Sequence, residues 1–224
     1  MPKISASVLS ADLSELKTEI VHAREAGAHW LHIDVMDGFF VPPITIGDVV
    51  QKSLYQNLKK QGLIGDMVFD THLMVNEPPN EMLKNFADAG SEYITIHVES
   101  GFETSELVQK LEYIQSIGCK AGIAINPPTP IETAFPFLGI ADLFVLMSVN
   151  PGYGGQAFIP ETLDKIAVLR KQANEKGLTP LILVDGGIND KTAPDVIKVG
   201  ADVLVTGSYL FNADDMKSAI SRLS

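Results

Sequence analysis

The chain has 224 residues, of which 46% are apolar and 20% are charged, a composition typical of a folded globular protein and not of a disordered one. It carries 28 Asp and Glu against 17 Lys and Arg, and the formal net charge of −11 argues against nucleic acid and anionic membrane surfaces as partners. No apolar run approaches the ~18 residues that span a bilayer. The same charge raises the question of how such a protein would bind an anionic small molecule.

The N-terminal residues and the cysteine content predict a cytoplasmic location. Met1 to Ser5 lead directly into a strand-like pattern, so we expect no signal peptide. Cys119 is the only cysteine, which predicts no internal disulfide and is in keeping with a reducing compartment.

Short apolar strands alternate with amphipathic helices along the chain. Residues 4–9 are strand-like, residues 13–26 carry apolar side chains at helical spacing, and residues 30–35 form the next strand. The polar stretch from Gln56 to Asp66 delays the third strand and predicts a surface excursion. Further strands are expected near residues 67–73, 93–98, 120–125, 143–148, 181–185 and 203–206. Glycines that suit the left-handed end of a helix follow most of the helices, at Gly27, Gly62, Gly90, Gly118, Gly177 and Gly200.

Eight strand–helix units favour a closed (β/α)8 TIM barrel of the α/β class, formed by residues 1–224 as a single domain. The strand from Leu143 to Met147 is apolar throughout, which is the pattern of a parallel strand buried on both faces. A doubly wound open sheet is the alternative that the pattern alone leaves open.

Candidate metal ligands stand where three of the predicted strands end. His32 and Asp34 are two residues apart and share one face of a strand, and His72 and Asp185 end two other strands. These side chains would converge on one barrel mouth, where two imidazoles and two carboxylates suit Zn²⁺, Fe²⁺, Mn²⁺ or Co²⁺. Each His taken alone is as readily a hydrogen-bonded core residue, whereas an Asp that ends a buried strand is costly unless it is paired or metal-bound.

The remaining histidines carry less information. His22 and His29 are expected on the surface, while His97 ends a strand, where a supporting contact to the metal site is the less favoured interpretation.

Glycine-rich segments follow the last three predicted strands and suggest a phosphate site. Backbone N–H groups hold a phosphate where no Cβ blocks its approach, and barrels of this kind commonly use the loops after the seventh and eighth strands. Plain turn chemistry accounts for any one segment, but three on neighbouring strands favour the phosphate. The segments are Gly152-Tyr153-Gly154-Gly155, Gly186-Gly187 and Gly207-Ser208.

Three methionines also stand at strand ends. Met36, Met74 and Met147 are explained either as core filling or as a soft apolar lining around a reacting carbon.

Together these motifs resemble the ribulose-phosphate 3-epimerase family along essentially the whole chain. The residues that carry the resemblance are Ser7-Val8-Leu9-Ser10-Ala11-Asp12, His32-Ile33-Asp34-Val35-Met36-Asp37-Gly38, His72-Leu73-Met74, Asn126-Pro127, Met147-Ser148-Val149-Asn150-Pro151-Gly152-Tyr153-Gly154-Gly155-Gln156, Val184-Asp185-Gly186-Gly187 and Gly207-Ser208.

The resemblance implies that the chain interconverts D-ribulose 5-phosphate and D-xylulose 5-phosphate by proton transfer at C3 through an enediolate. It implies one divalent metal ion per subunit, with zinc the first choice, held by His32, Asp34, His72 and Asp185. Asp34 would be the proton acceptor and Asp185 the donor in the ribulose-to-xylulose direction. A homo-oligomer is also implied, of a size that the sequence does not give. The implied substrate contacts are Ser7, His72, Gly152, Tyr153, Gly154, Gly155, Asp185, Gly186, Gly187, Gly207 and Ser208, with Met36, Met74 and Met147 lining the reacting face.

The sequence departs from the family pattern at three positions. Phe39 and Pro43 stand where the family usually has His and Asn, and they would border the mouth of the site. Leu183 replaces a usual Glu, which would alter either the surroundings of the site or the barrel interior.

Three other functions remain open on the sequence alone. The nearest is a 3-epimerase of a related ketose phosphate such as D-allulose 6-phosphate, which would use the same metal and bases. An aldolase or decarboxylase would call for a lysine at a strand end, whereas Lys120 starts its strand. An inert phosphate-binding barrel would have lost a ligand or a base, and all four positions are intact.

Overall fold

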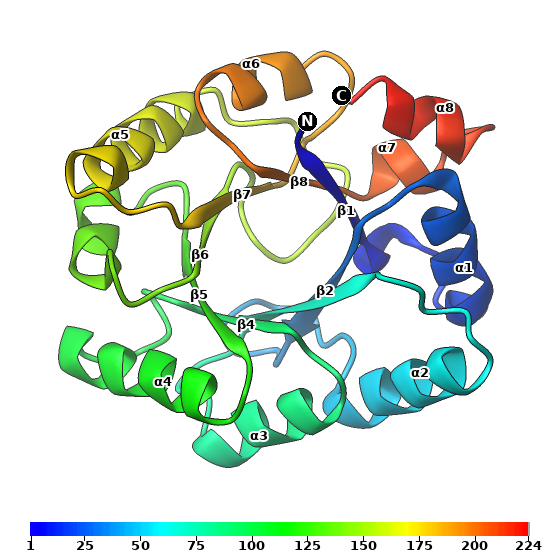
Figure 1. Cartoon of the computed structure of the whole chain (residues 1–224), viewed down its shortest axis with the longest axis horizontal. Helices are drawn as coiled ribbons and strands as arrows, with labels where there is room; N and C mark the ends of the chain where they lie inside the picture. The colour runs from blue at the N-terminus through cyan, green and yellow to red at the C-terminus, as the bar shows by residue number, and fades with distance from the viewer. Residues whose placement is uncertain (224) are drawn as a thin grey trace.

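The computed structural model describes residues 1–223 and shows a closed barrel of eight parallel strands, seen end-on in Figure 1. Neighbouring strands pair in chain order, and β8 closes the ring against β1. The predicted (β/α)8 fold is therefore confirmed, and the open-sheet alternative is excluded. The strands are β1 (Lys3–Ser7), β2 (Trp30–Met36), β3 (Val68–Met74), β4 (Tyr93–His97), β5 (Lys120–Ile125), β6 (Leu143–Met147), β7 (Leu181–Asp185) and β8 (Val203–Thr206).

The helices lie around the outside of the barrel (Figure 1). The connection from β5 to β6 contains the 3₁₀ helix η2 (Ile131–Phe137) where most other connections carry an α-helix. The α-helices are α1 (Leu16–Ala26), α2 (Asp48–Lys60), α3 (Asn80–Asp88), α4 (Thr104–Ser116), α5 (Thr162–Glu175), α6 (Ala193–Lys198), α7 (Ser208–Phe211) and α8 (Met216–Ser221), and a second 3₁₀ helix, η1 (Val8–Ser10), follows β1.

Two apolar layers hold the barrel together, and strand alternation assigns each residue to one of them. On β2, Leu31 and Ile33 point outward into the core shared with the helices, whereas Trp30 belongs to the cluster inside the barrel. Each buried Leu or Ile contributes about 1.5–3 kcal/mol. Because side chains alternate, His32 and Asp34 share the interior face with Trp30. The strand pattern thus places the two candidate ligands inside the barrel.

A separate apolar cluster lies inside the barrel. Trp30 and Tyr93 stack there with ring centroids 4.6 Å apart. Leu183, one of the departures from the family pattern, is fully buried in this cluster, two residues before Asp185. The Leu at this position therefore alters the packing of the barrel interior.

Several element boundaries differ from the sequence-based expectation, most of them by one residue and three of them by more. β1 ends at Ser7, and helix α1 begins at Leu16 rather than at residue 13. Leu13 is 51% exposed, because the Asp12 side chain accepts hydrogen bonds from the Ser14 amide and hydroxyl and forms a turn there. The predicted surface excursion from Gln56 to Asp66 is wrong in its first half, since α2 continues to Lys60 and covers the outside of the barrel.

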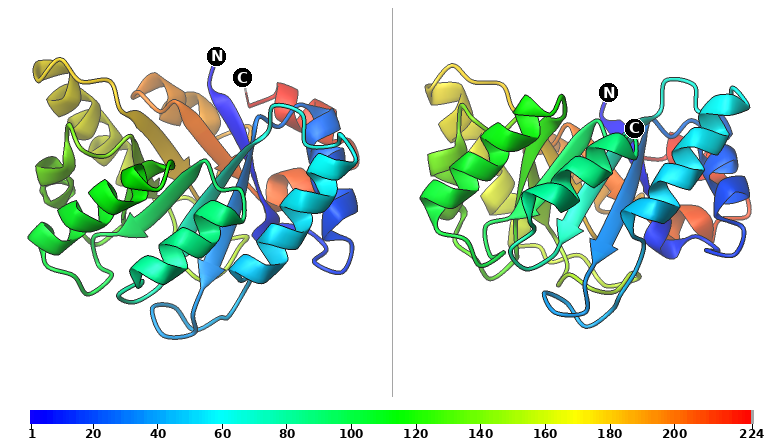
Figure 2. Two further views of the ribbon diagram at one scale, coloured as in Figure 1. Left: turned by 60° about the horizontal axis from the view of Figure 1, so that its bottom comes forward. Right: turned by 90° about the horizontal axis from the view of Figure 1, so that it is seen from below.

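The strands all end at one face of the barrel. Figure 2 shows the strand arrows pointing toward the face where the long loop after β2 protrudes, while the N-terminus lies at the opposite end. No helix of the described residues is long and apolar enough to cross a membrane.

Candidate active site

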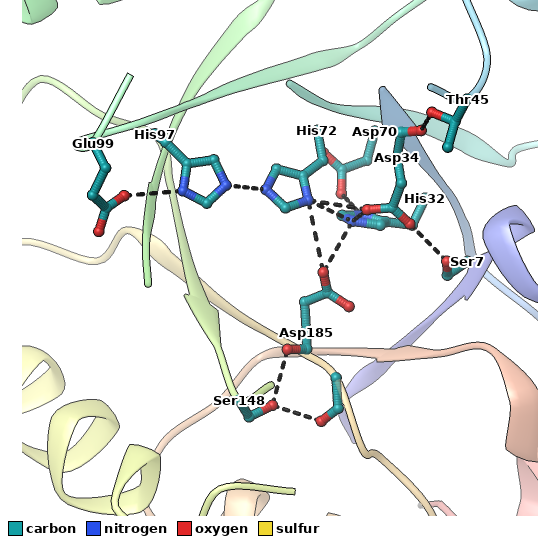
Figure 3. Close-up of polar contacts among 11 residues, drawn as sticks. Ser7, His32, Asp34, Thr45, Asp70, His72, His97, Glu99, Ser148 and Asp185 are labelled. Carbon is teal, nitrogen blue, oxygen red and sulfur yellow. Dashed lines mark hydrogen bonds and ion pairs between the residues drawn. The ribbon is translucent and has the colours of Figure 1, made fainter. Parts of the chain in front are cut away.

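Four predicted ligands meet at the mouth of the barrel. His32 and Asp34 come from β2, His72 from β3 and Asp185 from β7, and one ligand atom from each lies within 4.8 Å of all the others. All four residues are buried. Figure 3 shows an oxygen of each carboxylate facing Nδ1 of His72.

The spacing of these atoms fits a divalent metal ion. His32 Nε2 lies 3.3 Å from Asp34 Oδ1, 3.5 Å from Asp185 Oδ2 and 3.2 Å from His72 Nδ1. His72 Nδ1 lies 3.2 Å from Asp34 Oδ1 and 3.7 Å from Asp185 Oδ2. Ligand atoms at about 2.0–2.1 Å from a tetrahedral ion are about 3.3–3.4 Å apart. The donor set therefore matches a small cation in both chemistry and spacing.

Hydrogen bonds on the far side of each imidazole decide which nitrogen is offered to a metal. His32 donates its Nδ1–H to Asp70 Oδ2 at 2.7 Å, which leaves Nε2 facing Asp34 and Asp185. His72 contacts His97 through Nε2 at 2.8 Å, which leaves Nδ1 facing the same carboxylates. Metal-ligating histidines characteristically make such outer contacts with the other ring nitrogen.

The site favours a positive charge at its centre. Burial alone lowers the pKa of the His32 imidazole, but the carboxylates of Asp34, Asp70 and Asp185 raise that pKa well above its usual value. Burial raises the pKa of Asp34, but the charges and hydrogen bonds of His32 and His72 hold it below its usual value. A proton on His32 and a bound metal cation would each balance the negative charge of these carboxylates. Metal binding would therefore displace a proton.

His97 differs from His32 and His72. Burial, the largest effect, lowers the pKa of His97 to about 4, so its ring is neutral at pH 7. Its Nδ1 lies 3.0 Å from Glu99 Oε2.

A pocket of about 330 Å³ opens above the four ligands. Asp34 and Asp185 form part of its wall together with Met36, Met74 and Met147, whereas the fully buried His32 and His72 lie beneath it. Ser7 lines the pocket and donates its hydroxyl hydrogen to Asp34 Oδ2 at 2.8 Å. The three methionines therefore line the cavity next to the carboxylates.

The predicted phosphate segments line the opposite part of the same pocket, and close packing there requires glycine. A Cβ on Gly186, where φ is +113°, would lie 2.3 Å from Val149, and one on Gly207 would lie 2.6 Å from the Ser10 hydroxyl. The remaining members that line the pocket are Gly152, Tyr153, Gly154, Gly155, Gly187 and Ser208.

Free backbone donors reach this part of the pocket. Within residues 1–223, the N–H groups of Gly187, Gly207 and Ser208 have no hydrogen-bond acceptor in the protein. None of the described residues that line the pocket is Lys or Arg. An anion in this place would meet peptide dipoles and no cationic side chain.

Two of the departures from the family pattern lie at the rim. Phe39 is 80% exposed, outside the pocket. Pro43 packs beside Gly152, where its Cδ would lie 3.7 Å from an added Cβ. His22 and His29 are exposed, as expected.

Several residues of the site were missed from the sequence. Asp70, which hydrogen-bonds His32, lies two residues before His72 on one strand face, and that spacing could have revealed it. Ser10, Gln156, Asn189 and Asn212 also line the pocket. They lie in loops or near short helices, where no periodicity marks them.

Comparison with known proteins agrees with this geometry. The family model described as "Ribulose-phosphate 3 epimerase family" matches residues 3–211. A ribulose-phosphate 3-epimerase of Synechocystis sp. is 44% identical over 97% of this chain and 91% of its own length. One of Bacillus subtilis is 41% identical over 100% of this chain and 98% of its own length. Relatives named in this way show that the chain is an enzyme of the isomerase class.

The solved structures support the fold. A crystal structure of KGPDC from Streptococcus mutans matches with a TM-score of 0.72 over 100% of this chain and 95% of that chain, at 12% identity. The likeness to this structure shows a shared barrel, while the extended sequence matches show the relationship: the chain belongs to the ribulose-phosphate 3-epimerase family.

Proposed function

We propose that the chain interconverts D-ribulose 5-phosphate and D-xylulose 5-phosphate by moving a proton at C3 between two carboxylates. The observation that carries this proposal is the placement of Asp34 and Asp185 on the wall of one pocket. They rise from β2 and β7, with β1 and β8 between these strands, and so approach a bound substrate from different sides.

The reaction needs an acceptor and a donor on the two faces of one carbon. Asp34, ionised and held by Ser7, takes the C3 proton of ribulose 5-phosphate. Asp185 enters this direction protonated and gives its proton to the opposite face, which leaves Asp34 protonated and Asp185 ionised, and the two roles exchange in the reverse direction. The methionine side chains keep water away from the carbon while it carries charge.

We propose zinc as the metal of this site, because two imidazoles and two carboxylates whose ligand atoms lie within 4.8 Å of one another suit it. His32, Asp34, His72 and Asp185 would hold the ion. When bound, the ion would supply Lewis-acid charge beside the substrate oxygens.

The phosphate of the substrate would lie against Gly187, Gly207 and Ser208. Their free N–H groups would donate hydrogen bonds to the phosphate oxygens without a cationic side chain, which is how a chain of net charge −11 can bind a sugar phosphate. The names of the similar ribulose-phosphate 3-epimerases specify a sugar phosphate, which supports this class of ligand.

A side-by-side assay tests the proposal. Purified protein is supplied with D-ribulose 5-phosphate or D-allulose 6-phosphate, and metal content is measured on the same sample. We expect preferred turnover of the pentulose phosphate, loss of activity after chelation, and recovery with Zn²⁺. Preferred turnover of the hexulose phosphate would overturn the substrate assignment. Full activity of metal-free protein would remove His32 and His72 from the proposed role.

A further inference from the structure

A chain of hydrogen bonds leads from the proposed metal site to the loop after β5. His72 contacts His97 through their Nε2 atoms at 2.8 Å, and His97 Nδ1 contacts Glu99 Oε2 at 3.0 Å (Figure 3). His72 and His97 are fully buried, and the Glu99 side chain is 23% exposed.

The direction of each bond in this chain follows from Glu99. Burial raises the pKa of the Glu99 carboxyl, but its bonds to His97, Thr129 and Asn126 hold the pKa below its usual value, so Glu99 is ionised and only accepts. His97 must therefore donate its Nδ1–H to Glu99. A neutral imidazole that donates from Nδ1 accepts at Nε2, so His72 must donate its Nε2–H to His97. His72 is then left with a lone pair on Nδ1, the atom that faces Asp34 and Asp185.

We propose that Glu99, acting through His97, fixes His72 in the tautomer that presents Nδ1 to a metal ion. Glu99 and His97 are positioning residues, and neither touches the metal or the substrate. The inference rests on the metal site of the proposed function and adds two residues that control it.

The hydrogen bonds of the other Glu99 oxygen determine how a glutamine at this position would be oriented. Glu99 Oε1 accepts the backbone N–H of Asn126 at 2.9 Å and the hydroxyl of Thr129. A backbone N–H cannot become an acceptor, so a glutamine at position 99 must keep its oxygen on Asn126. Its NH₂ group then points at His97 Nδ1.

The Glu99→Gln variant therefore exchanges the donor and acceptor roles along this chain of hydrogen bonds, because Gln has the same shape as Glu. His97 would accept at Nδ1 and carry its hydrogen on Nε2, where it meets the Nε2–H of His72 at 2.8 Å. Two donors cannot share that distance, so His72 would move its hydrogen to Nδ1 and lose the lone pair that faces the carboxylates. Loss of such an outer contact typically lowers metal affinity by about 10- to 100-fold.

The matched variants are Thr129→Val and His97→Gln. Thr129→Val removes the second hydrogen bond to Glu99 Oε1 and leaves the bond to His97 in place. His97→Gln offers an amide oxygen to the His72 Nε2–H and lacks the second ring nitrogen through which a change at Glu99 reaches His72. In the His97→Gln background, Glu99→Gln should have no further effect if the two residues act in series.

The experiment measures Zn²⁺ affinity by competition with a chelator for the full-length chain and these variants, with melting temperature recorded for each. We expect Glu99→Gln to bind Zn²⁺ about 10- to 100-fold more weakly, Thr129→Val to match the wild type, and the double variant to match His97→Gln. Glu99→Gln binding as tightly as the wild type would overturn the positioning role. The positioning role would also be overturned if Glu99→Gln lowered Zn²⁺ affinity equally in the wild-type and His97→Gln backgrounds. Glu99 would then act through the loop at residues 126–129. Failure of the wild type itself to bind Zn²⁺ would instead overturn the metal site of the proposed function.

Discussion

Ser7 donates its hydroxyl hydrogen to Oδ2 of Asp34 at 2.8 Å, between paired strands β1 and β2. The other oxygen of this carboxylate faces His32 and His72 at 3.3 and 3.2 Å. The proposed base is thus held at both oxygens, and a hydrogen bond to the ionised form favours that form. The Ser7 hydroxyl therefore fixes the orientation of the Asp34 carboxylate.

Ser7→Ala should slow turnover while leaving the barrel folded. Without this bond Oδ2 is no longer held in place, and a misplacement of about 1 Å of a reacting group costs about 10²-fold in kcat. Steady-state kinetics with D-ribulose 5-phosphate measure the loss. Ser5→Ala is the matched control, because Ser5 lies two residues earlier on the same strand face, and its buried hydroxyl has no hydrogen-bond partner among the described residues. Equal losses from both substitutions would contradict a specific role for Ser7.

Asp34→Asn and Asp185→Asn should each lower turnover by at least about 10²–10⁴-fold, because each removes one of two acid–base groups. The two variants should differ in D₂O. With ribulose 5-phosphate as substrate, Asp185→Asn keeps the proposed acceptor, so deuterium should enter C3 without formation of the epimer. Asp34→Asn should neither incorporate deuterium at C3 nor form the epimer. NMR of the recovered sugar distinguishes the two outcomes, and near-normal epimerisation by either variant would rule out the two-base scheme.

Gly207→Ala should weaken substrate binding. An added Cβ would lie 2.6 Å from the Ser10 hydroxyl, so the Gly207–Ser208 backbone or Ser10 must move. Displacing a backbone donor from an anionic phosphate costs about 1.5–3 kcal/mol, which is about a 10- to 100-fold rise in KM. The control is Gly47→Ala, because position 47 precedes α2, has φ of −97° and has open space around its Cβ. An unchanged KM in Gly207→Ala would argue against a phosphate at this place.

Much of the fold follows from local pattern. β5, β7 and β8 have the predicted bounds, and the glycines expected after the helices have positive φ, as at Gly27 and Gly200. The meeting of His32, Asp34, His72 and Asp185 could be predicted because strand alternation and the common end of parallel strands bring these side chains together. His32 and Asp34 needed only their spacing of two residues.

Other features depend on contacts that no periodicity encodes. Helix α1 begins later in the chain than predicted because the Asp12 carboxylate accepts a hydrogen bond from the Ser14 amide. The side chain here competes with the helical backbone for that donor. The contacts of His97 with His72 and Glu99 could not be predicted, because the sequence does not show that these two residues flank it. Asn189 and Asn212 enter the pocket from the segments after β7 and β8, where the chain path alone decides what faces the cavity.

Asp37 should make the stability of the protein depend on pH through the loop after β2. Its Oδ1 accepts the N–H groups of Phe39 and Phe40 at 2.8 and 2.7 Å, and its Oδ2 accepts the N–H of Asn76 at 2.9 Å, which ties this loop to the end of β3. Burial raises the pKa of Asp37, but these backbone bonds lower it below its usual value. A carboxyl whose folded pKa is depressed stabilises the fold above its unfolded pKa of about 3.9 and loses that contribution as pH falls further. Urea unfolding should therefore show Asp37→Asn to be about 1–3 kcal/mol less stable than the wild type at pH 7. The difference in the free energy of unfolding between Asp37→Asn and the wild type should become smaller below about pH 4. Asp66→Asn, at an exposed position before β3, should show no such difference at either pH. A difference for Asp37→Asn that stays constant down to pH 3 would show that the carboxylate charge is not what holds the loop.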